Sequence, residues 1–226
     1  TLSKAEISRR FNIAASTMSE WLAGSFKGVY ANVTEKVLNA LRAEDERRAA
    51  RKVNIVEPPF LLLPTAKKVQ DALILAQATP TLALITLGPG MGKTETARNF
   101  IATRPHAFRV VMRPSTQTVH LMLREIAATF GIEGAHPSYL SRFIGDRLKR
   151  NGRHTLLIVD EAQHLVEQAV NELRYLLDEF GCGIALLGNE DVHTRFGGVQ
   201  PKDGYGQLHR RIGLRIRQLK PTQRDI

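Results

Sequence analysis

One stretch of the chain strongly restricts the folds open to it, Leu82 to Phe100 (LALITLGPGMGKTETARNF). An apolar run, 82–87, is followed by a glycine-rich turn, then by Lys93 and Thr94, and then by residues with helical spacing. This order of strand, glycine loop, lysine, hydroxyl and helix is typical of a phosphate-binding loop. Glycines let backbone N–H groups converge on a phosphate, and the helix N-terminus adds donors and a partial positive charge. The stretch therefore predicts an α/β fold with a nucleotide site at the end of a buried strand.

The residues expected to hold the nucleotide are consecutive. They are Gly88, Pro89, Gly90, Met91, Gly92, Lys93, Thr94 and Glu95. Lys93 is expected to reach the β- and γ-phosphates of ATP, and the Thr94 hydroxyl is expected to ligate Mg²⁺. One position departs from the usual pattern, because Leu87 stands where the first glycine is usual and Gly88 comes one step later. The alternative is a glycine-rich strand-to-helix turn with no ligand.

A second motif, Thr155 to Glu161 (TLLIVDE), is an apolar strand that ends in two acids. Asp160 is expected to hold Mg²⁺ through its water shell, as the aspartate at this position does in nucleotide hydrolases with such a loop. Glu161 is expected to polarise the attacking water as a general base. Two solvated acids at a strand end are the alternative.

Two further residues are candidates for a catalytic role. Asn189 follows an apolar strand, 183–187, where a polar side chain could reach the γ-phosphate or position the water; the alternative is a helix cap. Arg211 lies in a tail rich in arginine and is the candidate arginine finger for ATP bound by a neighbouring subunit. Arg210 is the fallback for that role, and contact with DNA or solvent is the alternative for both arginines.

Strand and helix patterns alternate from residue 65 onward. The strands are expected at 82–87, 108–113, 155–159, 183–187 and 214–219, and the helices at about 93–103, 117–130, 138–150 and 167–180, with a short one near 190–196. This alternation predicts a parallel sheet with helices on both faces, in which ligands bind beyond the carboxyl ends of the strands.

The N-terminal segment has a different pattern. Residues 3–23 predict two short helices joined at Asn12, with Gly24 ending the second, as in a helix-turn-helix. Its outward residues Ser16, Thr17 and Ser19 are candidates for DNA contact; a helical hairpin that binds protein is the alternative. Thr34 is the expected N-cap of a further helix. The expected domains are 1–50 (helix-turn-helix), 51–64 (linker) and 65–226 (ATPase).

Bulk composition narrows the class of protein. The net charge of +10 exceeds what ATP and Mg²⁺ require, and it favours a polyanionic partner such as nucleic acid over a basic surface that only keeps the chain soluble. No apolar run approaches the roughly 18–20 residues that span a bilayer, so no membrane partner is expected. The single cysteine, Cys182, excludes an intramolecular disulfide, suits a reducing cytoplasm and is expected to be a small buried residue.

The motifs LGPGMGKT, LLIVDE, LLGN and HRRIG together resemble an AAA+ ATPase. The chain is similar over nearly its whole length to the family of the phage Mu transposition protein B and its transposon relatives. The similarity includes the helix-turn-helix, Glu57-Pro58-Pro59, GMGKTETAR, Arg113 to Ser115, IVDEAQHL, LGNEDV, and the loop from Phe196 to Gly206 before QLHRRI. The fold that this implies is an AAA+ core, a five-stranded parallel sheet with helices on both faces, preceded by a small all-α helix-turn-helix domain.

The resemblance also implies a function. It implies an ATP-bound helical homo-oligomer on duplex target DNA, in the cytoplasm of a bacterial host, that recruits a DDE transposase and is released when ATP is hydrolysed. Such a filament touches phosphates rather than bases. The candidate DNA contacts are Arg113, Ser115, Thr116, Thr118, Arg147, Lys149, Arg150 and Arg153. The motifs also permit a helicase-loader or DNA-remodelling ATPase, or a helix-turn-helix transcription regulator that senses nucleotide.

Overall fold

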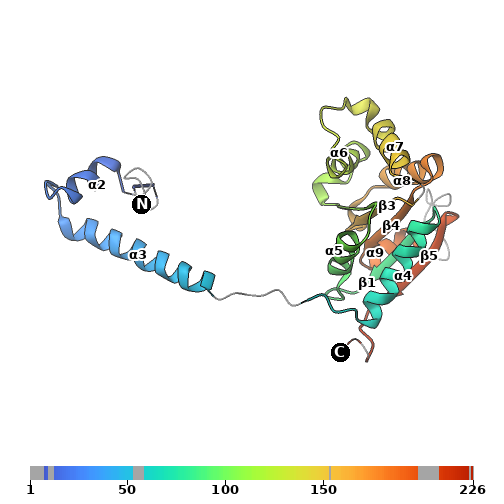
Figure 1. The fold of residues 1–226 in the computed structure, drawn as a ribbon, viewed down its shortest axis with the longest axis horizontal. Coiled ribbons are helices and arrows are strands. Elements are labelled where there is room, and N and C mark those ends of the chain that lie inside the picture. Colours follow the sequence, from blue (N-terminus) through green and yellow to red (C-terminus); the bar gives the residue numbers. More distant parts are fainter. Residues whose placement is uncertain are drawn as a thin grey trace. The chain divides into compact units, whose positions relative to one another are not determined.

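The computed structural model describes residues 8–9, 13–52, 59–152, 154–197, 209–223 and 225, with only the backbone of 49–52. Contacts within the chain divide it into two compact units, Thr1–Pro59 and Phe60–Ile226 (Figure 1). The division falls inside the segment predicted as a linker, 51–64. In the part of the chain that the structure describes, no helix is both long enough and apolar enough to cross a bilayer.

The first unit contains the helices α2 (Ala15–Leu22) and α3 (Tyr30–Lys52). Its small core consists of Ile13, Met18, Val33 and Val37, with Trp21 and Phe26 packed against them. Gly24 follows α2 with a φ of 72°, as the sequence predicts. Thr34 is not the N-cap of α3, because the helix begins at Tyr30 and the Thr34 hydroxyl donates to the Tyr30 carbonyl oxygen (2.9 Å). Most of the first predicted helix, 3–11, lies outside the described residues.

The second unit is built on a five-stranded sheet with the order β2-β3-β4-β1-β5. The strands are β1 (Leu82–Leu87), β2 (Ala107–Val111), β3 (Leu156–Asp160), β4 (Gly183–Gly188) and β5 (Ile212–Gln218). All four neighbouring pairs are parallel, which confirms the predicted sheet. Because β1 lies between β4 and β5, the phosphate-binding loop leaves the sheet from an interior strand.

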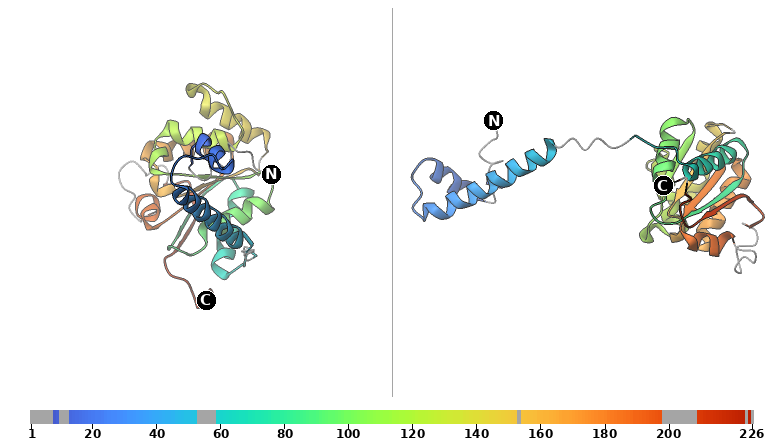
Figure 2. Two further views of the ribbon diagram at one scale, coloured as in Figure 1. Left: turned by 90° about the vertical axis from the view of Figure 1, so that its left-hand side faces the viewer. Right: turned by 90° about the horizontal axis from the view of Figure 1, so that it is seen from below.

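Helices cover both faces of this sheet (Figures 1 and 2). They are α4 (Pro64–Ala78), α5 (Lys93–Thr103), α6 (Val119–Thr129), α7 (Leu140–Arg150), α8 (Glu167–Phe180) and the short α9 (Glu190–Val192). Successive residues of a strand point to opposite faces. Thus Ala83 and Ile85 join the core under α4 and α5, whereas Leu82 and Leu84 join the core under α6, α7 and α8.

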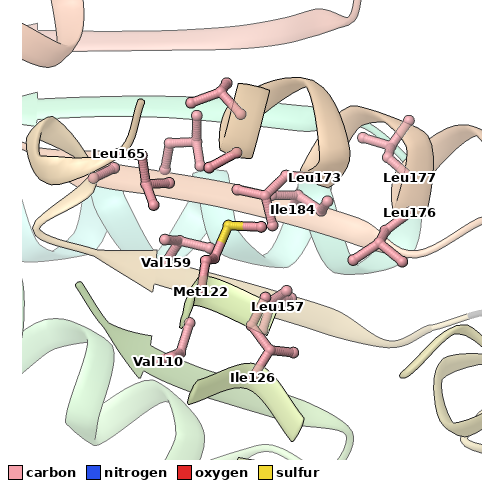
Figure 3. Packing of buried hydrophobic residues seen from close by; sticks show 14 of the residues in the cluster. Val110, Met122, Ile126, Leu157, Val159, Leu165, Leu173, Leu176, Leu177 and Ile184 are labelled. Atoms are coloured by element: carbon pink, nitrogen blue, oxygen red, sulfur yellow. The ribbon is translucent and has the colours of Figure 1, made fainter. Parts of the chain in front are cut away.

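The larger core is shown in Figure 3, where Leu157 and Val159 of β3 lie against Met122 of α6 and Leu173 of α8. Each fully buried side chain of this size stabilises the fold by about 1.5–3 kcal/mol. Cys182 packs into the same cluster with 1% of its surface exposed, and burial raises the pKa of its thiol to about 12. The prediction of a small buried cysteine is therefore confirmed.

A polar clamp joins the C-terminal segment to the start of α4. The carboxylate of Asp225 accepts hydrogen bonds from the Thr65 backbone N–H (2.9 Å) and the Thr65 hydroxyl (2.8 Å). Gln218, at the end of β5, also donates to the Thr65 hydroxyl (2.7 Å). Asp225 therefore supplies an acceptor at the first turn of α4, although it lies far from that helix in sequence.

Candidate nucleotide site

The loop between β1 and α5 adopts a backbone conformation that depends on glycine at two positions. Gly90 and Gly92 take φ values of 71° and 73°, in the left-handed region that residues with a side chain rarely adopt. A Cβ at Gly90 would meet nothing within 4 Å, so the loop faces open space there. A cavity of about 710 Å³ opens at this point. Its walls are Pro89, Gly90, Met91, Gly92, Lys93, Thr94, Glu95, Arg98, Glu161, Gln163 and Asn189.

Gly88 has a different role from the other loop glycines. It does not line the cavity but lies against β5, where its N–H donates to the Gln218 carbonyl oxygen (3.0 Å). A Cβ at Gly88 would come within 2.2 Å of the Leu219 carbonyl oxygen. The preceding Leu87 is buried as the last residue of β1. The displaced glycine of the sequence pattern therefore meets a packing requirement of the sheet.

Lys93 is the first residue of α5 and lies in the wall of the cavity. Its ammonium donates to the carbonyl oxygens of Leu87 (2.9 Å) and Gly88 (3.0 Å). Burial lowers the pKa of Lys93 below its usual value, and the carboxylates of Glu161 and Asp160 act in the opposite direction. The chain thus holds a partly desolvated cation beside the open side of the loop, which suits an anionic phosphate.

Asp160 is the point where three elements meet. It is fully buried at the end of β3, and its Oδ2 accepts a hydrogen bond from the Thr94 hydroxyl (3.0 Å). The same oxygen accepts from Arg109 of β2, from Nε at 3.1 Å and from Nη2 at 2.6 Å. Arg109 was not among the predicted site residues; its one signal in the sequence is a lone arginine inside the apolar strand AFRVV.

Glu161 adopts a strained backbone conformation. Its φ of 55° places a residue with a side chain in the left-handed region, which is uncommon outside glycine, asparagine and aspartate. Its N–H donates to Asp160 Oδ1 (3.0 Å), and its carboxylate accepts a hydrogen bond from the Gln163 side chain. Arg195 donates to the carbonyl oxygens of Gln163 (2.7 Å) and Leu165 (2.6 Å) and so holds this turn in place. Neither Gln163 nor Arg195 was among the predicted site residues.

Asn189 lies in the cavity wall and also acts as a cap. Its Oδ1 accepts from the Asp191 backbone N–H (3.0 Å), so in this structure its side chain caps α9. The neighbouring Glu190 accepts from Arg217 of β5 (2.6 Å), and this hydrogen bond lowers the pKa of Glu190. The cap role of Asn189 is thus observed, and the role of γ-phosphate sensor stays a prediction.

Arg211 lies at the opposite end of the sheet from the phosphate-binding loop. It immediately precedes β5, and its carbonyl oxygen accepts from Leu82 at the start of β1 (3.3 Å). Its guanidinium pairs with Asp178 of α8 (3.0 Å), with 53% of the Arg211 side chain exposed. Because β1 separates Leu82 from the loop, Arg211 is remote from the nucleotide site of its own subunit. Any action of Arg211 on a nucleotide would therefore be on ATP bound by another copy.

The candidate DNA contacts fall into separate groups. Arg113, Ser115 and Thr118 are exposed beyond the carboxyl end of β2, and Arg113 pairs with Glu125 (2.7 Å). Thr116 differs, because it is buried and its hydroxyl accepts from the Arg113 N–H (2.9 Å). We assign Thr116 to shaping this turn and leave it out of the proposed DNA surface.

A second group lies near the amino ends of the strands. Arg147, Lys149 and Arg150 are exposed in the last turn of α7, which leads into β3. The Lys149 ammonium lies 4.9 Å from the centre of the Phe180 ring. The structure therefore does not bring this group together with the residues after β2. Arg153 lies outside the described residues, as does most of the loop 196–206.

The helix-turn-helix candidates lie on α2 of the first unit. Ser16 is exposed, whereas Thr17 and Ser19 are half-buried. The nucleotide site lies in the second unit.

The residues at the loop fit a nucleotide with Mg²⁺. Because the Thr94 hydroxyl donates its proton to Asp160, its oxygen lone pairs are available to a cation. Among the described residues, no group of three or more His, Cys, Asp or Glu side chains could hold a metal without such further ligands. Thr94 and Asp160 would hold Mg²⁺, which would offset the negative charge of the phosphates there. Lys93 would bind phosphate, and Glu161 would accept a proton from water.

Comparisons with known proteins agree with this geometry. The sequence model described as the AAA domain matches residues 77–196, more than half of the chain. Two solved structures share the fold with a TM-score of 0.50 and 16% identity, each aligned over 74% of this chain: the ORC2 protein of Aeropyrum pernix in its ADP form and Cdc6p from Pyrobaculum aerophilum. The alignments cover 50% and 48% of those chains and bear on the fold alone. The protein is thus an AAA ATPase.

Full-length relatives define the family more narrowly. The Mu-like prophage FluMu DNA transposition protein B of Haemophilus influenzae is 34% identical over 228 residues, which cover 99% of this chain and 77% of that protein. The ATP-dependent target DNA activator B of Escherichia phage Mu is 29% identical over 224 residues, 98% of this chain and 70% of that protein. The chain belongs to the family of Mu-like transposition protein B, and the resemblance seen in its motifs is confirmed.

Proposed function

We propose that this protein binds duplex DNA when it is loaded with ATP, oligomerises there as a helical filament, and presents that DNA to a DDE transposase. Hydrolysis of ATP, stimulated by DNA and by the transposase, then releases the DNA. The observation that carries the proposal is that Lys93, Thr94 and Glu161 line one cavity and that the buried Asp160 is bonded to Thr94. The chain also belongs to a family whose relatives include an ATP-dependent target DNA activator.

The placement of Arg211 supports assembly. An arginine finger acts on ATP that is bound by a neighbouring subunit. Arg211 and Lys93 of the same subunit lie beyond opposite ends of the strands. A chain with its finger at one end and its nucleotide at the other forms contacts that repeat head to tail. Such heterologous contacts generate a ring or an open helix.

The exposed basic and hydroxyl groups support a DNA partner that is read through its phosphates. The net charge of +10 and the exposed arginines of α7 provide counter-charges for phosphate oxygens. The proposed contacts are Arg113, Ser115, Thr118, Arg147, Lys149, Arg150 and Arg153, with Ser16, Thr17 and Ser19 of the first unit. Contacts of this kind position a protein on DNA without selecting a sequence.

Fluorescence anisotropy with two duplexes of unrelated sequence tests the proposal. The expected result is tight binding to both duplexes with ATP and Mg²⁺, weak binding without nucleotide, and an affinity that falls steeply as salt is raised. The control is Lys93→Ala, which is expected to lose the gain that ATP provides. Binding to one sequence only, with no dependence on nucleotide, would contradict the proposal. Strand separation fuelled by ATP would instead favour a DNA-remodelling ATPase.

A further inference from the structure

Arg109 forms an ion pair that the proposed function does not use. Its side chain extends from β2 along the face of the sheet that α4 and α5 cover, and it ends at Asp160 with N–O distances of 3.1 and 2.6 Å. The two side chains are 13% and 0% exposed, which makes this the most buried ion pair among the described residues. It involves the same carboxylate oxygen that the Thr94 hydroxyl contacts.

The fold itself does not call for an arginine at this position. Ala107 of β2 joins the apolar core on that face, as does Ile158, the residue that Arg109 faces in β3. Burying a charge in such surroundings is costly unless the charge is paired, and buried pairs are often no more stabilising than apolar residues of similar volume. The position therefore points to a role at the site that Asp160 serves.

That role follows from the charges of Lys93 and Glu161, which line the cavity, and of the buried pair Arg109 and Asp160 next to them. Lys93 and Arg109 are cationic, and Asp160 and Glu161 are anionic, so this group of four is neutral as a whole. At the rim, Arg98 and Glu95 offset each other in a pair at 3.5 Å. Without Arg109 the group would carry a net negative charge. Such a charge repels the triphosphate and attracts a divalent cation, and both effects are strong in a site partly shielded from water.

We propose that Arg109 is a built-in cation that shares Asp160 with Mg²⁺, so that the site holds ATP without the metal and gains less affinity from Mg²⁺ than a site with an unpaired aspartate. Hydrolysis still requires Mg²⁺, so the metal is needed more for turnover than for binding. The inference deepens the proposed nucleotide site and rests on nucleotide binding, but it does not depend on the proposed role with DNA.

The test measures the dissociation constant of ATP carrying a methylanthraniloyl fluorophore, without DNA, once in Mg²⁺ and once in EDTA. Arg109→Gln is expected to raise the ratio of the EDTA value to the Mg²⁺ value by about tenfold or more, given the strength of a unit charge at such distances. Weaker binding in EDTA is expected to provide most of that change. An unchanged ratio would overturn the proposal.

Two control variants separate charge from geometry. Arg109→Lys keeps the charge but lacks the planar fork, so its ratio is expected to stay within about threefold of that of the wild type. A ratio for Arg109→Lys that matches Arg109→Gln would mean that the guanidinium only positions Asp160, and it would overturn the role of charge. Arg104→Gln removes the same charge from an exposed position beyond the end of α5 and is expected to leave the ratio unchanged.

A second comparison avoids leaving the buried carboxylate of Asp160 without a cationic partner, which could unfold Arg109→Gln. Asp160→Asn is expected to bind the nucleotide in EDTA about tenfold more tightly than Asp160→Asn combined with Arg109→Gln, because only the former keeps the cation. Equal affinities would overturn the proposal. If the wild type binds the nucleotide as expected but ignores DNA, the proposed function fails and this inference stands.

Discussion

The two ends of the parallel sheet differ in how deeply their charged side chains are buried and in how many bonds those side chains form. At the carboxyl end, Asp160 is fully buried and bonded to Thr94 and Arg109, and Lys93 is partly buried beside it. At the amino end, Arg211 forms only a pair between exposed side chains. Buried, mutually bonded groups fix the geometry that chemistry requires, whereas exposed pairs contribute about 0–1 kcal/mol and are easily exchanged for a new partner. This difference is what the proposed function requires, in which each copy binds ATP at one end and acts on a neighbour with the other.

The largest expected effect comes from the amino end. Arg211→Ala is expected to keep nucleotide binding while DNA-stimulated hydrolysis falls by about 10³-fold, the low end of what arginine fingers contribute. Phosphate release in steady state measures this. Mixing Arg211→Ala with Lys93→Ala is expected to restore activity, because the second variant supplies Arg211 to the intact site of the first. A mixture as inactive as its components would refute action between subunits, and a larger loss in Arg210→Ala would transfer the role to Arg210.

At the carboxyl end, Glu161→Gln is expected to lower hydrolysis by about 10²-fold or more, because the proton acceptor for water is lost. ATP binding is expected to persist, since Glu161 is not expected to contact phosphate, and the protein is expected to remain longer on DNA. Single-turnover hydrolysis and dissociation rates from labelled duplex measure the two effects. Turnover equal to that of the wild type would exclude Glu161 as the base.

A smaller effect is expected from the end of α7. Arg147→Gln combined with Arg150→Gln is expected to weaken DNA binding and to reduce the slope of log affinity against log salt by about one for each lost phosphate contact. Nucleotide affinity is expected to stay the same, because this turn lies near the amino ends of the strands. Arg142→Gln, which removes an exposed charge from the start of the same helix, is the control. An unchanged slope in the double variant would remove α7 from the DNA surface.

The smallest effect concerns the clamp at the carboxyl end. Hydrogen bonds from Thr222 and Thr65 lower the pKa of Asp225 below its ordinary 3.8, so the carboxylate stabilises the fold at neutral pH and loses that contribution as pH falls below 3.8. Asp225→Asn is expected to melt at a slightly lower temperature at pH 7, with a difference that shrinks in acid. Thermal unfolding from pH 7 down to the lowest pH of cooperative melting measures this. A difference that grows in acid would contradict the assignment.

Much of the fold could be predicted, because local pattern determines it. The helices at 93–103 and 167–180 begin and end as predicted, since a glycine loop precedes the first and Gly181 follows the second. Strand ends differ from the prediction by only a residue or two, because an apolar run does not mark the residue at which a strand begins or ends. The N-cap at Thr34 was wrong because the pattern from Tyr30 onward is weakly amphipathic, so the helix start has no clear local signal.

The site was only partly predictable, because some of its contacts depend on tertiary arrangement. Lys93, Thr94 and Glu161 follow from motif spacing. The contact of Arg109 with Asp160 depends on the pairing of β2 with β3, which no local pattern specifies. The positions of the candidate DNA contacts were unpredictable for the same reason. The residues after β2 and those at the end of α7 lie at opposite ends of the sheet because of the direction in which the strands run.

The contact between Gly88 and β5 joins two backbones with no side chain between them. Because the Leu219 carbonyl oxygen occupies the space of a Cβ at position 88, any displacement of the last strand moves the root of the phosphate-binding loop. The Gly88 carbonyl oxygen in turn accepts a hydrogen bond from the ammonium of Lys93, so the segment after β5 and the lysine of the nucleotide site contact the same loop residue.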